Sequence, residues 1–206
     1  MKGIKNILFD FGGVILELAP EKCIEAFKRL GCPEEVFKGD FWTEGIFRKM
    51  DRGTASEEEF YNEIRRIGHI PQATDSEILD AWNSFIPGVQ ERTFKALRRL
   101  KERFPLYILS NVNLPHWRHC EENLMYYQGE NAFSWFKQTF TSYTLHLEKP
   151  ERAIYETVAR EAHIKPEETL FIDDRQENLD GAALVGFHTM ITKDGDWIDK
   201  LDNINL

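Results

Sequence analysis

The sequence predicts an α/β protein, a doubly wound parallel sheet with a helical subdomain inserted near its N-terminus. Three short apolar runs stop abruptly at polar residues, which is typical of the buried strands of a parallel sheet. These runs are Ile7–Phe9 before Asp10, Leu106–Leu109 before Ser110, and Leu170–Ile172 before Asp173. From Val89 onwards, helical and strand patterns alternate, which indicates βαβ units.

The inserted segment, from about position 20 to 85, contains no strand pattern and predicts short helices. They are expected from Pro20 to a stop at Gly31, from a capping box formed by Ser56 and Glu59, and from Asp75 to a break at Pro87. We therefore expect a core domain of residues 1–15 and 87–206 and a helical cap of residues 16–86.

The remaining elements complete the sheet. Helices are expected at about 90–103, 152–162 and 176–185, and strands at about 138–142 and 188–191. In open α/β sheets, ligands bind outside the carboxyl ends of the strands. The polar residues that end the strands should therefore meet in one crevice; they are Asp10, Ser110, Asn111, Asp173 and Asp174.

Charge and composition restrict the partners. The 206 residues suffice for one core with an appendage, and a net charge of −9 argues against a nucleic-acid partner. The three cysteines, Cys23, Cys32 and Cys120, show no disulfide or metal-ligand spacing, which suits a reducing compartment. The sequence has no basic leader and no apolar run near the ~18 residues of a membrane helix. We expect a cytoplasmic protein with a small-molecule substrate and no membrane partner; no feature fixes the oligomeric state.

The residues at the strand ends suit phosphoryl transfer. A carboxylate such as Asp10 can attack phosphorus in line if a cation offsets the repulsion between the two anions. Mg²⁺ favours oxygen ligands, and Asp10 with Asp173 and Asp174 could supply them. Ser110 and Asn111 could donate hydrogen bonds to a phosphate, and Lys149 would add a positive charge; these three are the candidate phosphate-binding residues.

Four segments, taken in order, resemble the motifs of the haloacid dehalogenase superfamily: FDFGGV with Asp10, LSN with Ser110, EKP with Lys149, and FIDD with Asp173. The resemblance spans nearly the whole chain and includes the helical cap. It implies that Asp10 is the nucleophile and a metal ligand, that Lys149 is catalytic, and that the carbonyl of Gly12 and the carboxylate of Asp174 complete the metal site. Asp173 would be a ligand or orient one, and Asn178 would orient the acid pair.

Position 12 departs from the usual phosphatase pattern of this superfamily. Most members have a second Asp there that protonates the leaving alcohol, whereas this chain has Gly12. General acid catalysis contributes ~10²- to 10⁴-fold, so we expect a leaving group that needs little protonation. The segments NVNLPH, EKPERAIY and FIDDRQENLDGA resemble the bacterial α-glucose-1-phosphate phosphatase branch, which also has Gly at this position. A sugar phosphate such as glucose 1-phosphate is therefore the expected substrate.

Two other functions remain open on the sequence alone. A metal-independent 2-haloacid dehalogenase would use the same Asp10 without the missing acid, although the pair Asp173 and Asp174 would then repel it strongly. A catalytically weak member of the fold could serve as a binding or regulatory protein.

Several residues have two interpretations on the sequence alone. His116, His146 and Glu17 could replace the missing acid, but surface or packing roles are more ordinary for such residues. The aromatic segment 113–140 could contact a sugar, or form a helical hairpin that packs on the core or a dimer partner. In the cap, the candidate substrate contacts are Phe41, Trp42 and Arg48.

Overall fold

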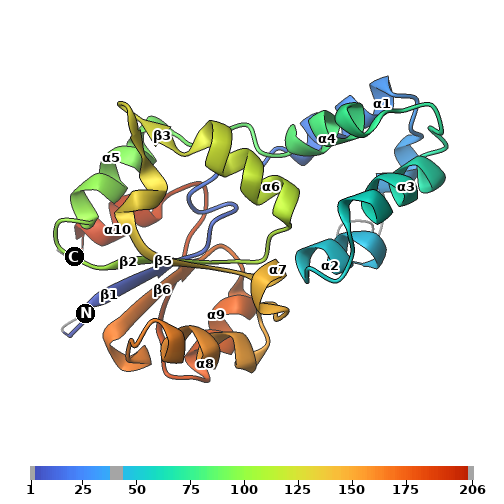
Figure 1. The fold of residues 1–206 in the computed structure, drawn as a ribbon. Coiled ribbons are helices and arrows are strands. Elements are labelled where there is room, and N and C mark those ends of the chain that lie inside the picture. Colours follow the sequence, from blue (N-terminus) through green and yellow to red (C-terminus); the bar gives the residue numbers. More distant parts are fainter. Residues whose placement is uncertain (1–2, 38–43, 204–206) are drawn as a thin grey trace.

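The computed structural model describes residues 3–37 and 44–203. Its centre is a five-stranded parallel sheet in the order β5-β2-β1-β6-β7 (Figure 1). The strands are β1 (Asn6–Phe9), β2 (Leu106–Ser110), β5 (Phe136–Thr141), β6 (Thr169–Asp173) and β7 (His188–Ile191). The chain runs from β1 outward to β5 on one side and then crosses to β6 and β7 on the other. This order places the reversal of the chain direction beside β1.

Helices cover both faces of the sheet, as the doubly wound prediction requires. On one face lie α5 (Glu91–Leu100), α6 (Leu114–His119) and α10 (Trp197–Asn203), and on the other lie α8 (Arg152–Glu161) and α9 (Gln176–Ala183) (Figure 1). Alternate strand residues face opposite ways, so Ile7 and Phe9 join the first core and Leu8 joins the second. All three side chains are fully buried. The α/β fold predicted from the apolar runs is confirmed.

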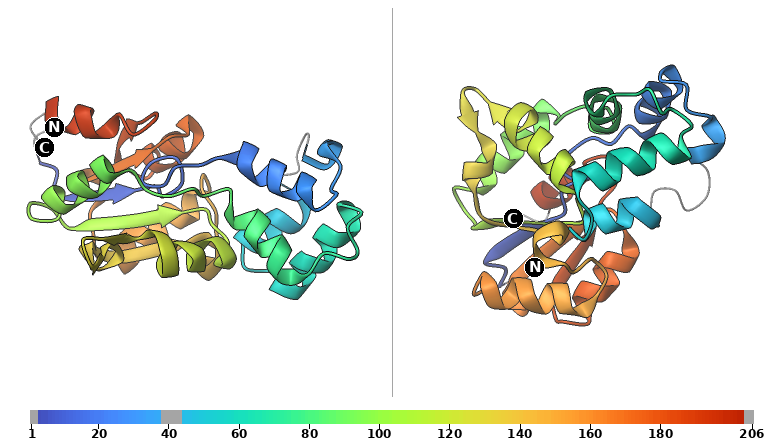
Figure 2. Two further views of the ribbon diagram at one scale, coloured as in Figure 1. Left: turned by 90° about the horizontal axis from the view of Figure 1, so that it is seen from above. Right: turned by 45° about the vertical axis from the view of Figure 1, so that its right-hand side comes forward.

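The inserted segment forms a helical unit with an apolar core of its own, set to one side of the sheet (Figures 1 and 2). It comprises α1 (Pro20–Arg29), a 3₁₀ turn (Glu34–Phe37), α2 (Gly45–Asp51), α3 (Glu57–Ile67) and α4 (Asp75–Asn83). The predicted capping box of Ser56 and Glu59 opens α3, and Thr74 with Glu77 forms a second one at α4. We call this unit the cap.

Two antiparallel linkers join the cap to the sheet. The backbone N–H of Glu17 donates to the carbonyl of Gly88 at 2.9 Å, and that of Ala19 donates to Phe85 at 2.8 Å. On either side of this pairing the apolar residues belong to different cores, with Leu16 in that of the sheet. This pairing lies near both ends of the cap that we propose for residues 16–86, although Leu16 and Ile86 themselves pack in the core of the sheet.

The aromatic segment differs from the expected helical hairpin. After α6 come a π-helical turn (Cys120–Leu124), a two-stranded hairpin of β3 (Tyr126–Tyr127) and β4 (Glu130–Asn131), and a 3₁₀ turn (Ala132–Trp135). Its aromatic rings pack on the sheet, with Trp117 5.3 Å from Phe11 and 4.8 Å from Phe133 between ring centroids. The packing interpretation is confirmed for these residues.

Three short elements connect the main ones or end the chain. A turn of helix, α7 (Ser142–Leu145), follows β5, and a 3₁₀ turn (Pro166–Glu168) precedes β6. The sequence analysis did not predict α10, whose Trp197 is fully buried and donates from Nε1 to the carbonyl of Val14 at 3.0 Å.

Within the described residues, every helix is too short or too polar to cross a bilayer.

Candidate active site

The carboxyl ends of three neighbouring strands bring the predicted site residues together. Asp10 follows β1, Ser110 ends β2 and Asp173 ends β6. The N–H of Asp10 donates to the carbonyl of Ile172 at 2.8 Å, so the pairing of β1 with β6 continues up to the predicted nucleophile. The register of the sheet therefore holds Asp10 and Asp173 on adjacent strands.

A buried lysine lies between two carboxylates. The Nζ atom of Lys149 is 2.7 Å from Oδ1 of Asp10 and 2.7 Å from Oδ2 of Asp173. Burial raises the pKa of Asp10 to about 7, against the attraction of Lys149 and reinforced by repulsion from Asp173 and Asp174. Burial would lower the pKa of Lys149, but the two carboxylates outweigh it and raise that pKa. Lys149 therefore stays charged beside the predicted nucleophile.

The three predicted metal ligands form one acidic cluster. Asp10, Asp173 and Asp174 each offer an oxygen, and these atoms lie within 4.8 Å of one another. Burial, and repulsion from Asp173, raise the pKa of Asp174 against the attraction of Lys149. Three carboxylates face a single lysine in this cluster. Carboxylate oxygens and an excess of negative charge suit Mg²⁺. The donor set therefore fits the predicted cation.

Asp173 is the most constrained member of the cluster. The Nδ2 atom of Asn178 donates to both its carboxylate oxygens, at 3.0 and 3.1 Å, and the N–H of Arg175 donates to Oδ1 at 2.8 Å. With Lys149 on Oδ2 as well, Asp173 has little capacity left for a cation. The contacts favour the alternative in which Asp173 orients Lys149, and Asp10 and Asp174 bind the metal. Asn178 lies where it was predicted to orient the acid pair.

The first loop passes close to this cluster. A Cβ atom added to Gly13 would lie 2.5 Å from Oδ2 of Asp174, and Gly13 has a φ of +77°. Both the contact and the backbone conformation therefore require glycine here. This close approach places the loop, including Gly12 with its predicted ligand carbonyl, against Asp174.

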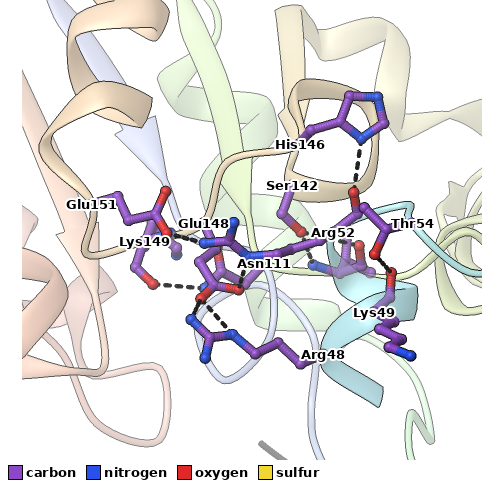
Figure 3. Close-up of polar contacts among 11 residues, drawn as sticks. Arg48, Lys49, Arg52, Thr54, Asn111, Ser142, His146, Glu148, Lys149 and Glu151 are labelled. Atoms are coloured by element: carbon purple, nitrogen blue, oxygen red, sulfur yellow. Dashed lines mark hydrogen bonds and ion pairs between the residues drawn. The ribbon is translucent and has the colours of Figure 1, made fainter. Parts of the chain in front are cut away.

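The two predicted phosphate-binding residues of β2 have different surroundings. Asn111 faces Lys149, with Nδ2 donating to the Lys149 carbonyl at 2.9 Å and Oδ1 accepting from its N–H at 2.8 Å (Figure 3). Ser110 lines a cavity, and its hydroxyl makes no hydrogen bond to any described residue. Ser110 is thus free for a phosphate oxygen, whereas the Asn111 side chain positions Lys149.

That cavity lies between the core and the cap and has a volume of about 190 Å³. The sheet side supplies Gly12, Ser110 and Asn111, and the cap supplies Phe47, Asp51 and Trp82. A larger cavity of about 580 Å³ lies along Asp174 on the other side of the first loop. Only the smaller one combines the predicted phosphate-binding residues with the cap, so we regard it as the substrate cavity.

Ion pairs tie the cap to the loop that carries Lys149 (Figure 3). Arg48 donates from Nε to Oε1 of Glu148 at 2.9 Å, and Nε of Arg52 lies 3.0 Å from Oε2 of the same residue. Arg52 also pairs with Glu151. Burial would raise the pKa of Glu148, but the two arginines outweigh it, so the pKa of Glu148 is lowered. Arg48, considered above as a substrate contact, thus bridges cap and core.

The candidates for the missing acid lie in three different places. His116 is stacked on Trp82, with ring centroids 4.6 Å apart, and its Nε2 lies 3.0 Å from the Trp82 carbonyl. Burial lowers the pKa of His116 to about 4, so the ring is neutral near pH 7 and packs the cap against α6. His146 is exposed and contacts the Arg52 carbonyl, and Glu17 is exposed at the linker. Phe41 and Trp42 lie outside the described residues.

The sequence analysis missed one cavity residue with chemistry of its own. Asp51 ends α2 and lines the substrate cavity, and its Oδ1 accepts a hydrogen bond from Nδ2 of Asn113 at 3.0 Å. Burial, and repulsion from Glu148, raise the pKa of Asp51 to about 6 against the opposing effect of Asn113. The sequence offered no signal for this residue. Asp51 follows no strand pattern and lies outside the predicted helices, so it resembled an ordinary surface residue.

Comparisons with known proteins identify the family of this chain. A haloacid dehalogenase-like hydrolase model matches residues 4–186. D-ribitol-5-phosphate phosphatase from Bacteroides thetaiotaomicron is 31% identical over 96% of this chain and 97% of its own length. A crystal structure of a haloacid dehalogenase family enzyme from that organism, in complex with magnesium and inorganic phosphate, has 36% identity and a TM-score of 0.87, covering 94% of this chain and 96% of its own.

More distant relatives extend the comparison. A sesquiterpene phosphatase from Aspergillus oryzae is 25% identical over 88% of this chain and 86% of its own length. The structure of an L-2-haloacid dehalogenase, at 18% identity and a TM-score of 0.62 over 93% of this chain and 85% of its own, shares the fold.

Proposed function

The chain belongs to the haloacid dehalogenase-like hydrolase family, and from this we propose that it hydrolyses a small phosphate monoester in a Mg²⁺-dependent reaction through a phosphorylated Asp10. One observation carries the proposal. Lys149 Nζ lies 2.7 Å from both Asp10 and Asp173, within an acidic cluster completed by Asp174. A nucleophilic carboxylate, a fixed positive charge and oxygen ligands for a cation thus meet at one strand edge.

The reaction has two halves. In the first, an oxygen of Asp10 attacks phosphorus in line, the bond to the leaving oxygen breaks, and that oxygen takes a proton from solvent, since Gly12 stands where most phosphatases of the superfamily have the proton donor. Lys149 and the hydroxyl of Ser110 stabilise the charge on the phosphoryl oxygens. In the second, water attacks phosphorus, and inorganic phosphate leaves as the Asp10 carboxylate is restored. Bound Mg²⁺ would supply the positive charge that offsets repulsion between the carboxylates and the phosphate; Asp10, Asp174 and the Gly12 carbonyl would hold it.

Sugar and polyol phosphates are the substrate class we propose. The phosphatase from Bacteroides thetaiotaomicron acts, by its name, on the 5-phosphate of a polyol, which supports a small hydroxylated substrate. Glucose 1-phosphate, expected from Gly12 and from the resemblance to the α-glucose-1-phosphate phosphatase branch, stays a prediction. We therefore place D-ribitol 5-phosphate first among the substrates to test. The three buried, free cysteines fit a cytoplasmic location.

The acidic cluster also separates the phosphatase from the two alternatives. A metal-independent dehalogenase would leave Asp10 facing Asp173 and Asp174 with one lysine between them, and this repulsion adds to burial in raising the pKa of Asp10. The likeness to dehalogenase structures shows the fold alone. No specific contact favours a silent binding protein, because Lys149 and Asn111 are held as a reactive site requires.

Phosphate release tests the proposal. The purified protein is incubated with D-ribitol 5-phosphate, glucose 6-phosphate, glucose 1-phosphate and 4-nitrophenyl phosphate, with Mg²⁺ or with EDTA, and a 2-haloacid is tested for halide release. We expect phosphate release that requires Mg²⁺, with a hydroxylated substrate preferred over the aryl phosphate in kcat/KM. Halide release that persists in EDTA, with no phosphate from any substrate, would overturn the proposal.

A further inference from the structure

The wall of the substrate cavity opposite the phosphate-binding residues carries a single carboxylate. Asp51 reaches the cavity from the end of α2, and the cap residues beside it are aromatic, Phe47, Trp82 and Phe85. Aromatic faces suit the C–H surface of a sugar or polyol chain. A carboxylate among them needs a polar partner, because an unpaired charge in an apolar wall is costly.

The protein satisfies only one side of this carboxylate. Oδ1 of Asp51 accepts from Nδ2 of Asn113, whereas Oδ2 has no hydrogen-bond partner among residues 3–37 and 44–203. Asp51 is partly buried and lines the cavity, so this second oxygen is open to a ligand or to water there. An acceptor is therefore left facing the cavity.

Asn113 is itself fixed from three directions. As the N-cap residue of α6, it accepts a hydrogen bond at Oδ1 from the N–H of His116 at 3.1 Å. The same Oδ1 also accepts from Nε1 of Trp82 at 3.3 Å. Its Nδ2 donates to Asp51. Asn113 is buried, so it joins α6 to two helices of the cap and fixes the orientation of the Asp51 carboxylate. Such preorganisation is typical of groups that recognise a ligand.

We propose that Asp51 binds a hydroxyl of the organic part of the substrate and that Asn113 positions it, so that this pair selects sugar and polyol phosphates over unhydroxylated ones. This inference rests on the proposed function. Hydroxyl groups donate to the free Oδ2, while the phosphate lies at Ser110, away from the negative charge of Asp51. The same charge repels a second anionic group, so bisphosphates and sugar-acid phosphates should be poor substrates.

Protonation does not remove the acceptor under ordinary assay conditions. The raised pKa of Asp51, about 6, leaves most of the carboxylate ionised at neutral pH. The charged groups near it are Glu148 from the core loop, Arg48 from its own helix and Arg52 at the C-cap of that helix; His116 of α6 is titratable but neutral near pH 7. Glu148 is paired with the two arginines, so it does not compete with Asp51 for a substrate hydroxyl.

The test compares two substrates that release a primary alcohol from a five-carbon chain, D-ribitol 5-phosphate and n-pentyl phosphate. Asp51→Leu removes the acceptor with little change of size, and Asp51→Asn keeps an oxygen for Asn113 but loses the charge. Hydrogen bonds to charged groups contribute about 1.5–3 kcal/mol, so Asp51→Leu should lower kcat/KM for ribitol 5-phosphate about 10- to 100-fold. For pentyl phosphate, kcat/KM of Asp51→Leu should stay within about threefold of the wild-type value. For ribitol 5-phosphate, kcat/KM of Asp51→Asn should lie between the values of the wild type and Asp51→Leu.

Asp80→Asn is the matched control, because Asp80 is exposed on α4 of the cap and does not line the cavity. It should leave both substrates unchanged, and thermal melts should show that every variant is folded. Equal losses on both substrates would overturn the inference, since a proton donor or a structural residue acts on both. Unchanged kcat/KM for ribitol 5-phosphate, or no preference for it in the wild type, would also overturn it. Failure of the proposed function is distinct: no substrate, including 4-nitrophenyl phosphate, would then release phosphate.

Discussion

The side chain of Asn111 makes hydrogen bonds to both backbone polar groups of Lys149, donating to its carbonyl at 2.9 Å and accepting from its N–H at 2.8 Å. A residue at the end of one strand thus fixes a loop 38 positions later in the chain. Lys149 in turn holds Asp10 and Asp173. The position of the ammonium group therefore depends on a carboxamide that need not touch the substrate.

Asn111→Ala should remove both backbone contacts of Lys149. We expect kcat to fall about 10- to 100-fold and stability to fall by about 1–3 kcal/mol, from two hydrogen bonds of ordinary strength. Steady-state kinetics and urea unfolding measure the two effects. Asn123→Ala is the control, because Asn123 is exposed and bonds only within its own turn. A kcat for Asn111→Ala equal to that of the wild type would show that Lys149 does not need this clamp.

Arg52→Gln should weaken the hold of the cap on the core, because Arg52 pairs with both Glu148 and Glu151 (Figure 3). Partly exposed ion pairs contribute up to about 1 kcal/mol, so KM should rise about two- to fivefold with little change of kcat. Salt screens such pairs, and the difference from the wild type should shrink at high ionic strength. Arg66→Gln, which breaks a pair within α3, should leave KM unchanged. A salt-independent effect of Arg52→Gln would contradict the ion-pair explanation.

Asp10→Asn should stabilise the metal-free protein. Burial and neighbouring carboxylates raise the pKa of Asp10 from 3.8 to about 7, so the folded state disfavours its ionised form. The cost grows as pH rises from about 4 to about 7 and is complete above that. Asparagine keeps an oxygen for Lys149 and carries no charge. We expect a gain of about 1–2 kcal/mol at about pH 8 and a smaller one at about pH 6. Thermal melts in EDTA measure it; a variant less stable than the wild type at both pH values would contradict this account.

His116 should make stability depend on pH in the opposite direction. Burial lowers its pKa from 6.5 to about 4, so the folded state disfavours the charged ring. Stability from this group is complete above about pH 6.5 and is lost as pH falls towards about 4, by up to about 3 kcal/mol. His116→Phe keeps a ring against Trp82 but cannot titrate, so its unfolding free energy should fall less over that range. If the unfolding free energies of the wild type and His116→Phe fell equally with pH, His116 would be excluded as the cause of the pH dependence.

The sequence predicted the sheet, and the polar residues at the carboxyl ends of its strands, because both depend on local patterns. The apolar runs ending at Asp10, Ser110 and Asp173 correspond to β1, β2 and β6, and the capping box at Ser56 opens α3. Each of these signals lies within a few consecutive residues. The pairing order of parallel strands then follows from the fold class.

The features that the sequence missed depend on contacts between distant segments. Asp51 resembles a surface residue until α2 packs beside Asn113, 62 positions later. The hydrogen bonds of Asn111 to the loop of Lys149, 38 positions later, were not predicted either. The C-terminal α10 was missed because its burial rests on two residues, Trp197 and Leu201, that pack on distant parts of the chain, with Trp197 also bonded to the first loop. Such contacts leave no periodic pattern in the chain.

The measurement that tests the central claim most directly is phosphate release from D-ribitol 5-phosphate by the wild type, Asp10→Asn and the control Asp80→Asn, each with Mg²⁺ and with EDTA. Thermal melts accompany it to show that the variants are folded. We predict release by the wild type and the control with Mg²⁺ only, and none by Asp10→Asn under either condition, because the attacking carboxylate is gone. Mg²⁺-dependent release by a folded Asp10→Asn protein at the wild-type rate would contradict the account.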